Sequence, residues 1–287
     1  MVEQIIKEEY SIHEIDTSQN GLVKLSALLS ETFNNSTLTK EYLDWMYNQN
    51  PNGKVVGYNA IFKEKIVAHY ALIPIEAEYQ NTNFKALHSV NTATSFQHKG
   101  KGLFTKLAKM TYDKGLSLGY EFVLGVANTN SLYGFTEKLG WKYISQLDTS
   151  ISLTYPKKIN PLNLKNCLTL TLSDKAKTWK LMNPKFKYNE YTINGIKIIA
   201  NELNFFSRSL VSLSQSSSEE SKFLIPKLNF WVGISQSYSW NERPLMSIKI
   251  PDFLKPSPLH LIFKNLSSSI KLNKKNIHFE AINFDAF

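Results

Sequence analysis

The sequence predicts an α/β (α+β) fold in which a mixed, mostly antiparallel sheet is flanked by helices. Alternating apolar runs follow one another between residues 55 and 94 and are separated by short polar turns, as consecutive antiparallel strands would be. A glycine-rich turn and an amphipathic helix come next, with Leu103, Leu107 and Met110 at helical spacing. Strand, short helix and strand patterns then follow between residues 120 and 154. Hairpins followed by alternating helices and strands make a mixed sheet rather than a wholly parallel one.

The segment before these strands is predicted to be mostly helical. Residues 4–16 are expected to contribute a first strand, and residues 21–33 show the leucine spacing of an amphipathic helix. Thr39 is the expected N-cap of a second helix over residues 40–48. The strands that follow are expected over residues 55–62, 66–79 and 84–94.

The turn after the last of these strands carries a Q-x-x-G-x-G pattern, formed by Gln97, Gly100 and Gly102. Glycines let successive backbone N–H groups face one ligand, and a helix N-terminus adds a favourable dipole for an anion. The turn lacks the G-x-x-x-x-G-K-[ST] pattern of a P-loop, and Thr105 occupies the place of the third glycine of a dinucleotide-binding turn. By itself, the turn predicts either a phosphate site or an ordinary glycine-rich loop.

A second stretch, residues 120–141, reads YEFVLGVANTNSLYGFTEKLGW. Taken with the turn, it strongly resembles the GNAT superfamily of acyl-CoA-dependent N-acyltransferases, over roughly residues 22–154. The resemblance implies that Gln97, Gly100 and Gly102 hold the pyrophosphate of CoA, with the intervening amides supplied by His98, Lys99 and Lys101. It also implies that Asn128 or Asn130 is the family's asparagine after the second strand, so we assign Asn128 to the catalytic centre and Asn130 to the CoA site.

The strand before the turn is expected to accompany the pantetheine arm of CoA. Asn91, Thr92 and Thr94 are predicted neighbours of that arm. The backbone N–H groups from Asn91 to Ala93 are expected to receive the charge that develops on the thioester oxygen. The implied co-substrate is acetyl-CoA or a short hydroxyacyl-CoA such as 3-hydroxybutanoyl-CoA, and no metal is implied.

The acid and base of the reaction have competing candidates. The family often places a general-acid tyrosine four residues before the closing glycine, and Thr136 occupies that position here. Tyr133, about 5 Å earlier along the helix axis, is either its replacement or a half-buried packing residue. His88 on the central strand is the candidate base, with His69 on the neighbouring strand as its competitor. Either histidine is alternatively a hydrogen-bonded core residue. A water relay could then remove the proton from the amine instead.

Aromatic and charged residues indicate an acceptor site. In the superfamily the segment between the first strands covers the acceptor, so Asp44, Trp45 and Tyr47 are candidates for the acceptor site. His69 is a further candidate. Helix packing is the alternative explanation for Trp45. Tyr238, Trp240 and Arg243 are further candidates, because aromatic faces stack on bases and sugars and a guanidinium binds diphosphate.

The long form of the sequence resembles GNAT enzymes of bacterial surface-polysaccharide pathways. That resemblance implies transfer to the amine of a nucleotide-linked sugar, for example a dTDP-linked amino-dideoxyhexose, by direct attack in a ternary complex. The alternatives are acetylation of an aminoglycoside, a polyamine or a protein amine, and a CoA-binding module that performs no chemistry.

The formal charge of +9 comes almost entirely from lysine. No dense basic stripe, zinc finger or helix-turn-helix pattern accompanies it, so we expect no nucleic-acid partner and favour a polyanionic small molecule. A dispersed, solvated surface is the alternative for most of these lysines. No signal peptide and no membrane-spanning segment is apparent, which predicts a cytoplasmic protein. The single cysteine, Cys167, excludes an internal disulfide and a cysteine-based zinc site, and is expected to be inert.

The character of the chain changes after Thr154, where prolines punctuate a more polar stretch. We therefore expect a GNAT acyl-CoA-binding domain over residues 1–155 and a smaller α/β or mostly β domain over residues 156–287, as a degenerate half of the same fold that contributes to the acceptor site. Its alternating runs lie at 192–199, 228–234 and 245–250, and residues 214–221 are expected to form an exposed loop. The oligomeric state is left open.

Overall fold

The computed structural model describes residues 10–154, 159–160, 164–216, 227–237, 247–250 and 258–285. The helices are α1 (Gln19–Phe33), α2 (Lys40–Tyr47), α3 (Leu103–Ser117), α4 (Thr129–Tyr133) and α5 (Asp174–Leu181). A π-helical turn over Gly134–Lys138 continues α4, and short 3₁₀ turns cover Phe96–His98, Lys274–Asn276 and Ala281–Asn283. The strands are β1 (Ser11–Glu14), β2 (Val56–Phe62), β3 (Lys65–Tyr79), β4 (Thr82–Thr94), β5 (Phe122–Asn128), β6 (Lys142–Gln146), β7 (Asp148–Ser152), β8 (Leu168–Thr171), β9 (Tyr188–Ile193), β10 (Ile196–Glu202), β11 (Ser207–Gln215), β12 (Leu228–Ile234), β13 (Ser247–Lys249), β14 (Leu259–Asn265) and β15 (Ile277–Glu280).

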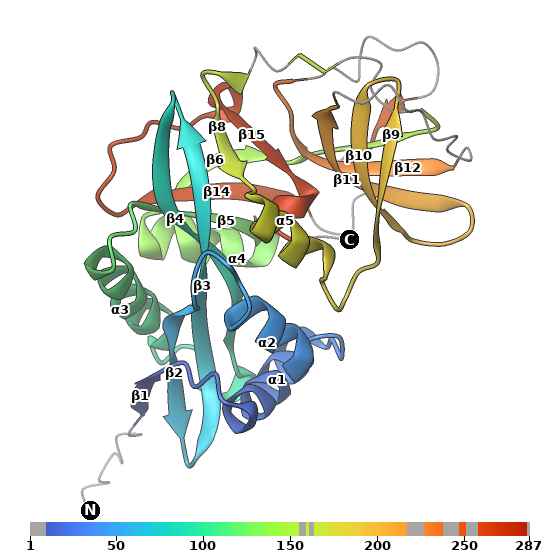
Figure 1. The fold of residues 1–287 in the computed structure, drawn as a ribbon. Helices are drawn as coiled ribbons and strands as arrows, with labels where there is room; N and C mark the ends of the chain where they lie inside the picture. Colours follow the sequence, from blue (N-terminus) through green and yellow to red (C-terminus); the bar gives the residue numbers. More distant parts are fainter. Residues whose placement is uncertain are drawn as a thin grey trace, which may run out of the picture. The chain divides into compact units, whose positions relative to one another are not determined.

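The elements confirm the predicted mixed α/β fold, and their order along the chain can be followed in Figure 1. The described part of the first strand, β1, is shorter than the expected span of residues 4–16. The chain separates into two compact units. Unit 1 contains residues 1–74 and 89–119, and unit 2 contains residues 75–88 and 120–287. β3 and β4 contribute residues to both units, whereas the predicted domain boundary at 155 stays a prediction.

In unit 1, helix capping fixes where α1 and α2 begin. The side chain of Ser18 accepts a hydrogen bond from the backbone N–H of Gly21 at 3.1 Å, and Thr39 accepts one from Tyr42 at 3.3 Å. Such caps satisfy amides that the first turn of a helix leaves without partners. The two helices lie side by side, as Figure 1 shows, and α3 packs against β2.

β2 and β3 form the predicted antiparallel hairpin in unit 1. Lys63 and Glu64 make its turn with φ angles of 47° and 63°, both in the left-handed region. This is the geometry of a two-residue turn whose twist matches that of the strands. The register places Asn59 opposite His69, so two polar residues face each other within apolar strands.

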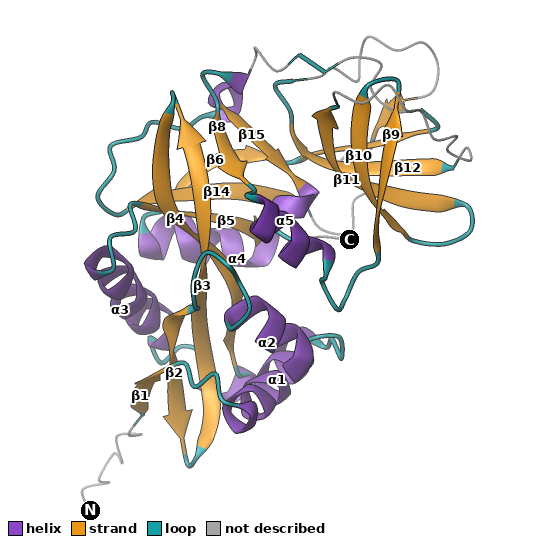
Figure 2. Cartoon of the chain, viewed as in Figure 1, coloured by secondary structure: helices purple, strands orange, loops and turns teal. Residues whose placement is uncertain are grey.

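In unit 2, the hydrogen-bonded strand order is β6, β14, β5, β4, β3, β8, β15, β12, β11, β10 and β9. Most of its pairs are antiparallel, whereas β8 with β15 and β11 with β12 are parallel. β14 comes from the C-terminal part of the chain, yet it lies between β5 and β6 and is hydrogen-bonded to both. Figure 2 shows β9 to β12 as a group of neighbouring strands.

A hairpin divides one of the alternating runs. The run at 192–199 contains the end of β9, at Ile193, and the start of β10, at Ile196. Asn194 and Gly195 adopt φ angles of 49° and 73° between them, which makes a hairpin. The run at 228–234 coincides with β12, and the run at 245–250 contains β13.

The core of unit 2 is built largely of strand residues. Phe122, Leu124, Leu261, Phe263 and Phe279 lie together in one cluster and are almost completely buried. Cys167 is also buried, and burial raises the pKa of its thiol above the ordinary value. A protonated, buried thiol suits the inert role that was expected for it.

Within the described residues, no helix is both long and apolar enough to cross a membrane.

Candidate functional site

The predicted anion-binding turn lies in unit 1 at the start of α3. Gly100 and Gly102 have φ angles of 78° and 75°, in the region that L-residues with a side chain rarely adopt. A Cβ atom at either position would meet nothing within 4 Å, so backbone conformation and not crowding requires glycine there. Gly102 is the N-cap of α3 and supplies no side-chain cap to the helix. The first N–H groups of a helix have no acceptor within the helix, which leaves this end suited to an anion.

The residues between Gln97 and Gly102 present positive charge at this turn. Gln97, Lys99 and Lys101 are exposed. The imidazole of His98 is hydrogen-bonded through Nδ1 to the hydroxyl of Tyr10 at 2.9 Å and contacts the ring of Phe62. His98 therefore anchors the turn to Tyr10, which precedes β1, and to β2, while its lysine neighbours are exposed.

The end of β4 in unit 1 departs from regular strand geometry. Asn91 has a φ of 52°, which is unusual for a residue with a side chain. Beyond it, Ala93 is buried, and the backbone N–H of Ser95 donates to the carbonyl oxygen of Val67 on β3 at 2.8 Å. The hydroxyl of Thr92 is buried without a hydrogen-bond partner among the described residues. Such local distortion reorients backbone N–H groups, as an oxyanion site needs.

Tyr47 and His69 belong to one buried chain of hydrogen bonds in unit 1. The hydroxyl of Tyr47 lies 2.9 Å from Nε2 of His69, and Nδ1 of His69 lies 2.7 Å from Oδ1 of Asn59. Nδ2 of Asn91 lies 3.1 Å from the Tyr47 hydroxyl. Burial lowers the pKa of His69 to about 3 and raises that of Tyr47 well above its usual range. Both groups are therefore neutral at physiological pH.

The other candidates on α2 have partners close to them along the chain. The carboxylate of Asp44 accepts hydrogen bonds from Nδ2 of Asn48 at 2.8 Å and from Nε2 of Gln49 at 2.6 Å. Trp45 is buried and stacks on Tyr42, with ring centroids 5.6 Å apart. These contacts match the packing alternative for Trp45, and they give Asp44 a role in ending α2.

His88 lies in unit 2 and is buried. Burial, with the charge of Lys180 as a smaller cause, lowers its pKa to about 3. Its Nδ1 has no hydrogen-bond partner among the described residues, and its ring lies 6.4 Å from that of Phe279. The imidazole is thus neutral at pH 7, as a base must be, but it is a weak proton acceptor.

In unit 2, Asn128 is the N-cap of α4. Its Oδ1 accepts the backbone N–H of Ser131 at 3.0 Å and the Ser131 hydroxyl proton at 3.1 Å. Asn130 is exposed on the next turn.

Tyr133 lies one turn further along and is 65% exposed. This exposure does not fit the alternative of a half-buried packing residue. Thr136 follows in the π-helical turn, and such turns recur at functional sites.

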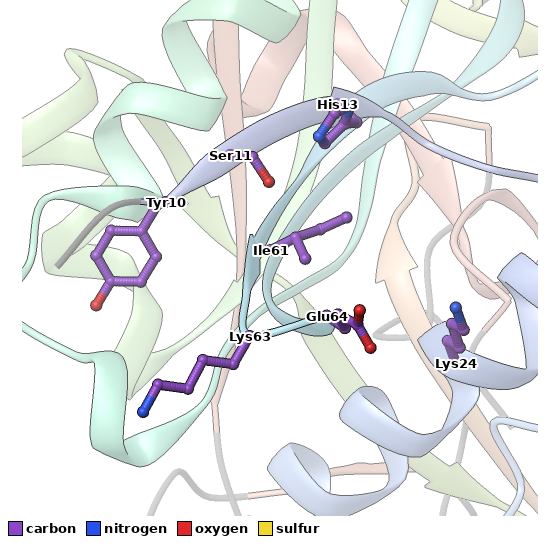
Figure 3. Close-up of a pocket in the computed structure, with 7 residues that line it drawn as sticks. All are labelled: Tyr10, Ser11, His13, Lys24, Ile61, Lys63 and Glu64. Atoms are coloured by element: carbon purple, nitrogen blue, oxygen red, sulfur yellow. The ribbon is translucent and has the colours of Figure 1, made fainter.

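Tyr238, Trp240 and Arg243 lie outside the described residues. A hollow in unit 1 has a volume of about 750 Å³ and opens beside β1 and the β2–β3 turn. Figure 3 shows the residues that line it, which are Tyr10, Ser11, His13, Lys24, Ile61, Lys63 and Glu64. None of them is a predicted site residue, although Tyr10 binds His98. The described residues contain no group of three or more side chains that suits a metal ion.

Comparison with known proteins matches this geometry to a domain family. Residues 16–144 match the family model described as an acetyltransferase (GNAT) domain. No curated protein sequence matches the chain.

Among solved structures, one similar protein is a probable N-acyltransferase from Enterococcus faecalis V583, described as a conserved protein of unknown function. It superposes with a TM-score of 0.67 at 7% identity, and the match covers 90% of this chain and 73% of the other. A GCN5-related N-acetyltransferase from Anabaena variabilis gives 0.61 at 12% identity, with 90% and 73% coverage. One from Kribbella flavida gives 0.58 at 8% identity, with 90% and 72% coverage.

These similarities define an α/β protein with the GNAT fold. Residues 16–144 match the GNAT domain model, and the protein is an acyl-CoA-dependent transferase. GNAT domains use acetyl-CoA or another acyl-CoA as the acyl donor.

Sequence reasoning missed Asn59, which orients His69. A signal was present, because Asn59 is a polar residue within the apolar run VGYNAIF, and the hairpin register predicts that it faces β3. Two polar residues opposite each other inside apolar strands indicate a buried hydrogen bond.

Proposed function

We propose that the protein transfers an acetyl or short hydroxyacyl group from acyl-CoA to the amine of a nucleotide-linked amino sugar, such as a dTDP-linked amino-dideoxy sugar, in the cytoplasm. The observation that carries the transfer chemistry is the turn at the start of α3. There, two left-handed glycines and an uncapped helix N-terminus follow directly on the distorted end of β4. A phosphate group suits the glycine turn at the helix N-terminus, and the backbone of a thioester-bearing arm suits the distorted end of β4.

The proposed reaction is a direct attack within a ternary complex. The amine nitrogen adds to the thioester carbon, and the C–S bond breaks to leave an amide and the CoA thiolate. The thiolate takes a proton from Tyr133 or water, and the surplus proton of the nitrogen goes to His88 or water. Backbone N–H groups from Asn91 to Ala93 would stabilise the oxyanion, while Gln97 to Gly102 would hold the pyrophosphate. No residue of the chain needs to form an acyl intermediate.

The base is the part of this scheme that the structure constrains most. A pKa of about 3 gives the His88 imidazole a small driving force for taking a proton from an ammonium group. A chain of water molecules that carries the proton to bulk solvent is the alternative once the amine is neutral and positioned. Substitution of His88 by alanine tests the assignment, and an unchanged kcat with an unchanged pH profile would assign the proton to water.

The charge of the protein supports an anionic acceptor. The net charge is +9, and the lysines at the turn are exposed. Asp44, an acidic candidate for the acceptor site, already accepts two side-chain hydrogen bonds, and this makes it a poor partner for a cationic aminoglycoside or polyamine. Tyr238, Trp240 and Arg243 are proposed contacts for the base, sugar and diphosphate of the acceptor.

A thiol-release assay tests the acceptor. Acetyl-CoA and 3-hydroxybutanoyl-CoA would each be paired with dTDP-amino sugars, with an aminoglycoside, spermidine and a lysine peptide as control acceptors. We expect thiol release with the nucleotide sugars alone. Release only with the controls would contradict the acceptor class and leave the transferase standing. Tight CoA binding without turnover on any amine would instead indicate a CoA-binding module.

A further inference from the structure

The hydrogen-bond chain of unit 1 leads from the core to the end of β4. It runs from Asn59 through His69 and Tyr47 to Asn91. Its inner members are no more than 3% exposed, whereas Asn91 is partly exposed. Asn91 therefore joins a buried polar chain to the distorted strand end.

Each hydrogen bond in this chain has one possible direction. Nδ2 of Asn91 also lies 3.5 Å from Sδ of Met46, which can only accept, so the amide nitrogen faces α2 and donates to the oxygen of Tyr47. The hydroxyl of Tyr47 then donates to Nε2 of His69, and Nδ1–H of His69 donates to Oδ1 of Asn59. A neutral imidazole in a single tautomer satisfies every partner. A protonated imidazole would carry a second proton, on Nε2, which would face the Tyr47 hydroxyl proton and disrupt the order.

This order fixes the amide of Asn91. Both of its N–H groups have acceptors, while Oδ1 has no hydrogen-bond partner among the described residues. The backbone at Asn91 is also held at a φ of 52°, which costs roughly 1 kcal/mol or more for a residue with a side chain. A side chain tied to a buried hydroxyl can offset that cost.

We propose that Asn59, His69 and Tyr47 act as a positioning relay for Asn91, which presents its Oδ1 to an N–H group of the bound substrates and keeps the adjoining β4 amides directed at the thioester. The proposal rests on the proposed acyl transfer. Two groups have a suitable N–H, the pantetheine arm of CoA and the amine of the acceptor. It also changes the part assigned to Tyr47 and His69, which act through Asn91 and do not touch the acceptor.

The test removes one hydroxyl from the relay. Tyr47→Phe deletes the link to Asn91, and Tyr70→Phe is its matched control. Tyr70 is as fully buried as Tyr47, and its hydroxyl shares a hydrogen bond of 2.6 Å with that of Tyr112 on α3. We expect Tyr47→Phe to lower kcat roughly two- to tenfold, the equivalent of one hydrogen bond, while Tyr70→Phe leaves kcat unchanged. Amide hydrogen exchange at Thr92 and Ala93 should accelerate in Tyr47→Phe alone.

A second variant separates positioning from general stability. Glycine adopts a φ of 52° without strain, so Asn91→Gly keeps the backbone accessible and removes the side chain. If the relay acts through Asn91, adding Tyr47→Phe to Asn91→Gly should change kcat no further. A full additional loss in the double variant, or equal effects of the two tyrosine substitutions, would overturn the proposal.

Asn91→Gly also identifies the N–H donor. Weaker CoA binding by calorimetry would assign the pantetheine arm, whereas unchanged CoA binding with a raised KM for the acceptor would assign the amine. If Asn91→Gly altered neither CoA binding nor the KM for the acceptor, the role proposed for Oδ1 would be overturned. If the wild-type protein transferred no acyl group, the proposed function would fail, but hydrogen exchange in Tyr47→Phe would still decide whether the relay orders β4.

Discussion

The hydroxyl of Thr136 donates a hydrogen bond to the carbonyl oxygen of Leu132 at 3.1 Å. Thr136 occupies the position at which the family often has its general-acid tyrosine. Its hydroxyl is hydrogen-bonded to the preceding helical turn. Tyr133, one turn earlier, is 65% exposed. The structure therefore leaves Tyr133 with the more accessible of the two hydroxyls in this segment.

We predict that Tyr133→Phe lowers kcat at least tenfold while the KM for acyl-CoA stays unchanged, because the substitution removes a proton donor without removing the ring. Thr136→Ala should leave kcat within twofold of the wild type. Tyr143→Phe, at another tyrosine exposed in unit 2, is the control for loss of a surface hydroxyl. Steady-state kinetics would measure all three, and equal rates for Tyr133→Phe and the wild type would assign protonation of the thiolate to water.

Gly100 and Gly102 should each resist substitution by alanine. The left-handed backbone would destabilise each variant by about 1–2 kcal/mol, and any relaxation of φ would move the amides of the turn. Gly119→Ala is a matched control, because Gly119 has a φ of 81° and a Cβ there also meets nothing within 4 Å. We expect a similar loss of stability in all three variants, measured by urea unfolding.

CoA affinity should distinguish these glycines. Calorimetry is expected to show at least tenfold weaker CoA binding for Gly100→Ala and Gly102→Ala, but not for Gly119→Ala. Equal CoA affinity in all three variants would remove the turn from the CoA site.

His69 should make unit 1 sensitive to acid. Its folded pKa of about 3 lies below its ordinary value of 6.5, so the unfolded state binds the proton more readily. The stabilising contribution of the neutral imidazole is complete above pH 6.5 and is lost as the pH falls toward 3. His69 by itself should contribute about 1.4 kcal/mol per pH unit to the slope.

Urea unfolding at pH 7, 6, 5 and 4 would measure this slope. His69→Gln should remove the contribution of His69 and make the pH dependence shallower. Identical slopes for His69→Gln and the wild type would show that His69 is protonated in the folded state.

The ion pair between Lys180 and Asp285 should be required for the stability of unit 2. The atoms Nζ and Oδ2 lie 2.7 Å apart, and the two side chains are 5% and 4% exposed. Lys180→Met leaves a buried carboxylate without its partner, so we expect a loss of about 3–5 kcal/mol. The double variant Lys180→Met, Asp285→Leu should recover most of that loss.

Lys114→Met is the comparison for the buried pair. It breaks an exposed pair with Glu14 and should leave the unfolding midpoint unchanged. A small effect of Lys180→Met, similar to that of Lys114→Met, would show that water reaches Asp285 readily.

The sequence predicted the order of elements well where a local cause sets it. The leucine spacing of α1, the N-cap Thr39 and the glycines of the turn each act within one helical turn, and all were readable in advance. The Asn194–Gly195 dipeptide also favours a two-residue turn between strands, and the structure has a hairpin there, within the alternating run at 192–199.

Long-range contacts were much less predictable. Nothing local places β14 between β5 and β6, since that pairing joins residues more than a hundred positions apart. The same holds for the link between Tyr47 and Asn91, which depends on how α2 packs beside β4. His88 and Tyr47 were chosen for their chemistry, while burial, which changes both pKa values, came only with the folded chain.

The position of β14 also constrains the order in which the protein is assembled during synthesis. β5 and β6 leave the ribosome early, but the strand that joins them follows only with residues 259–265. Until then, each has an edge of backbone N–H and C=O groups without its final partner, and such edges invite pairing with other chains. Nascent chains stalled before residue 259 should therefore depend on chaperones, whereas chains released after β14 should not.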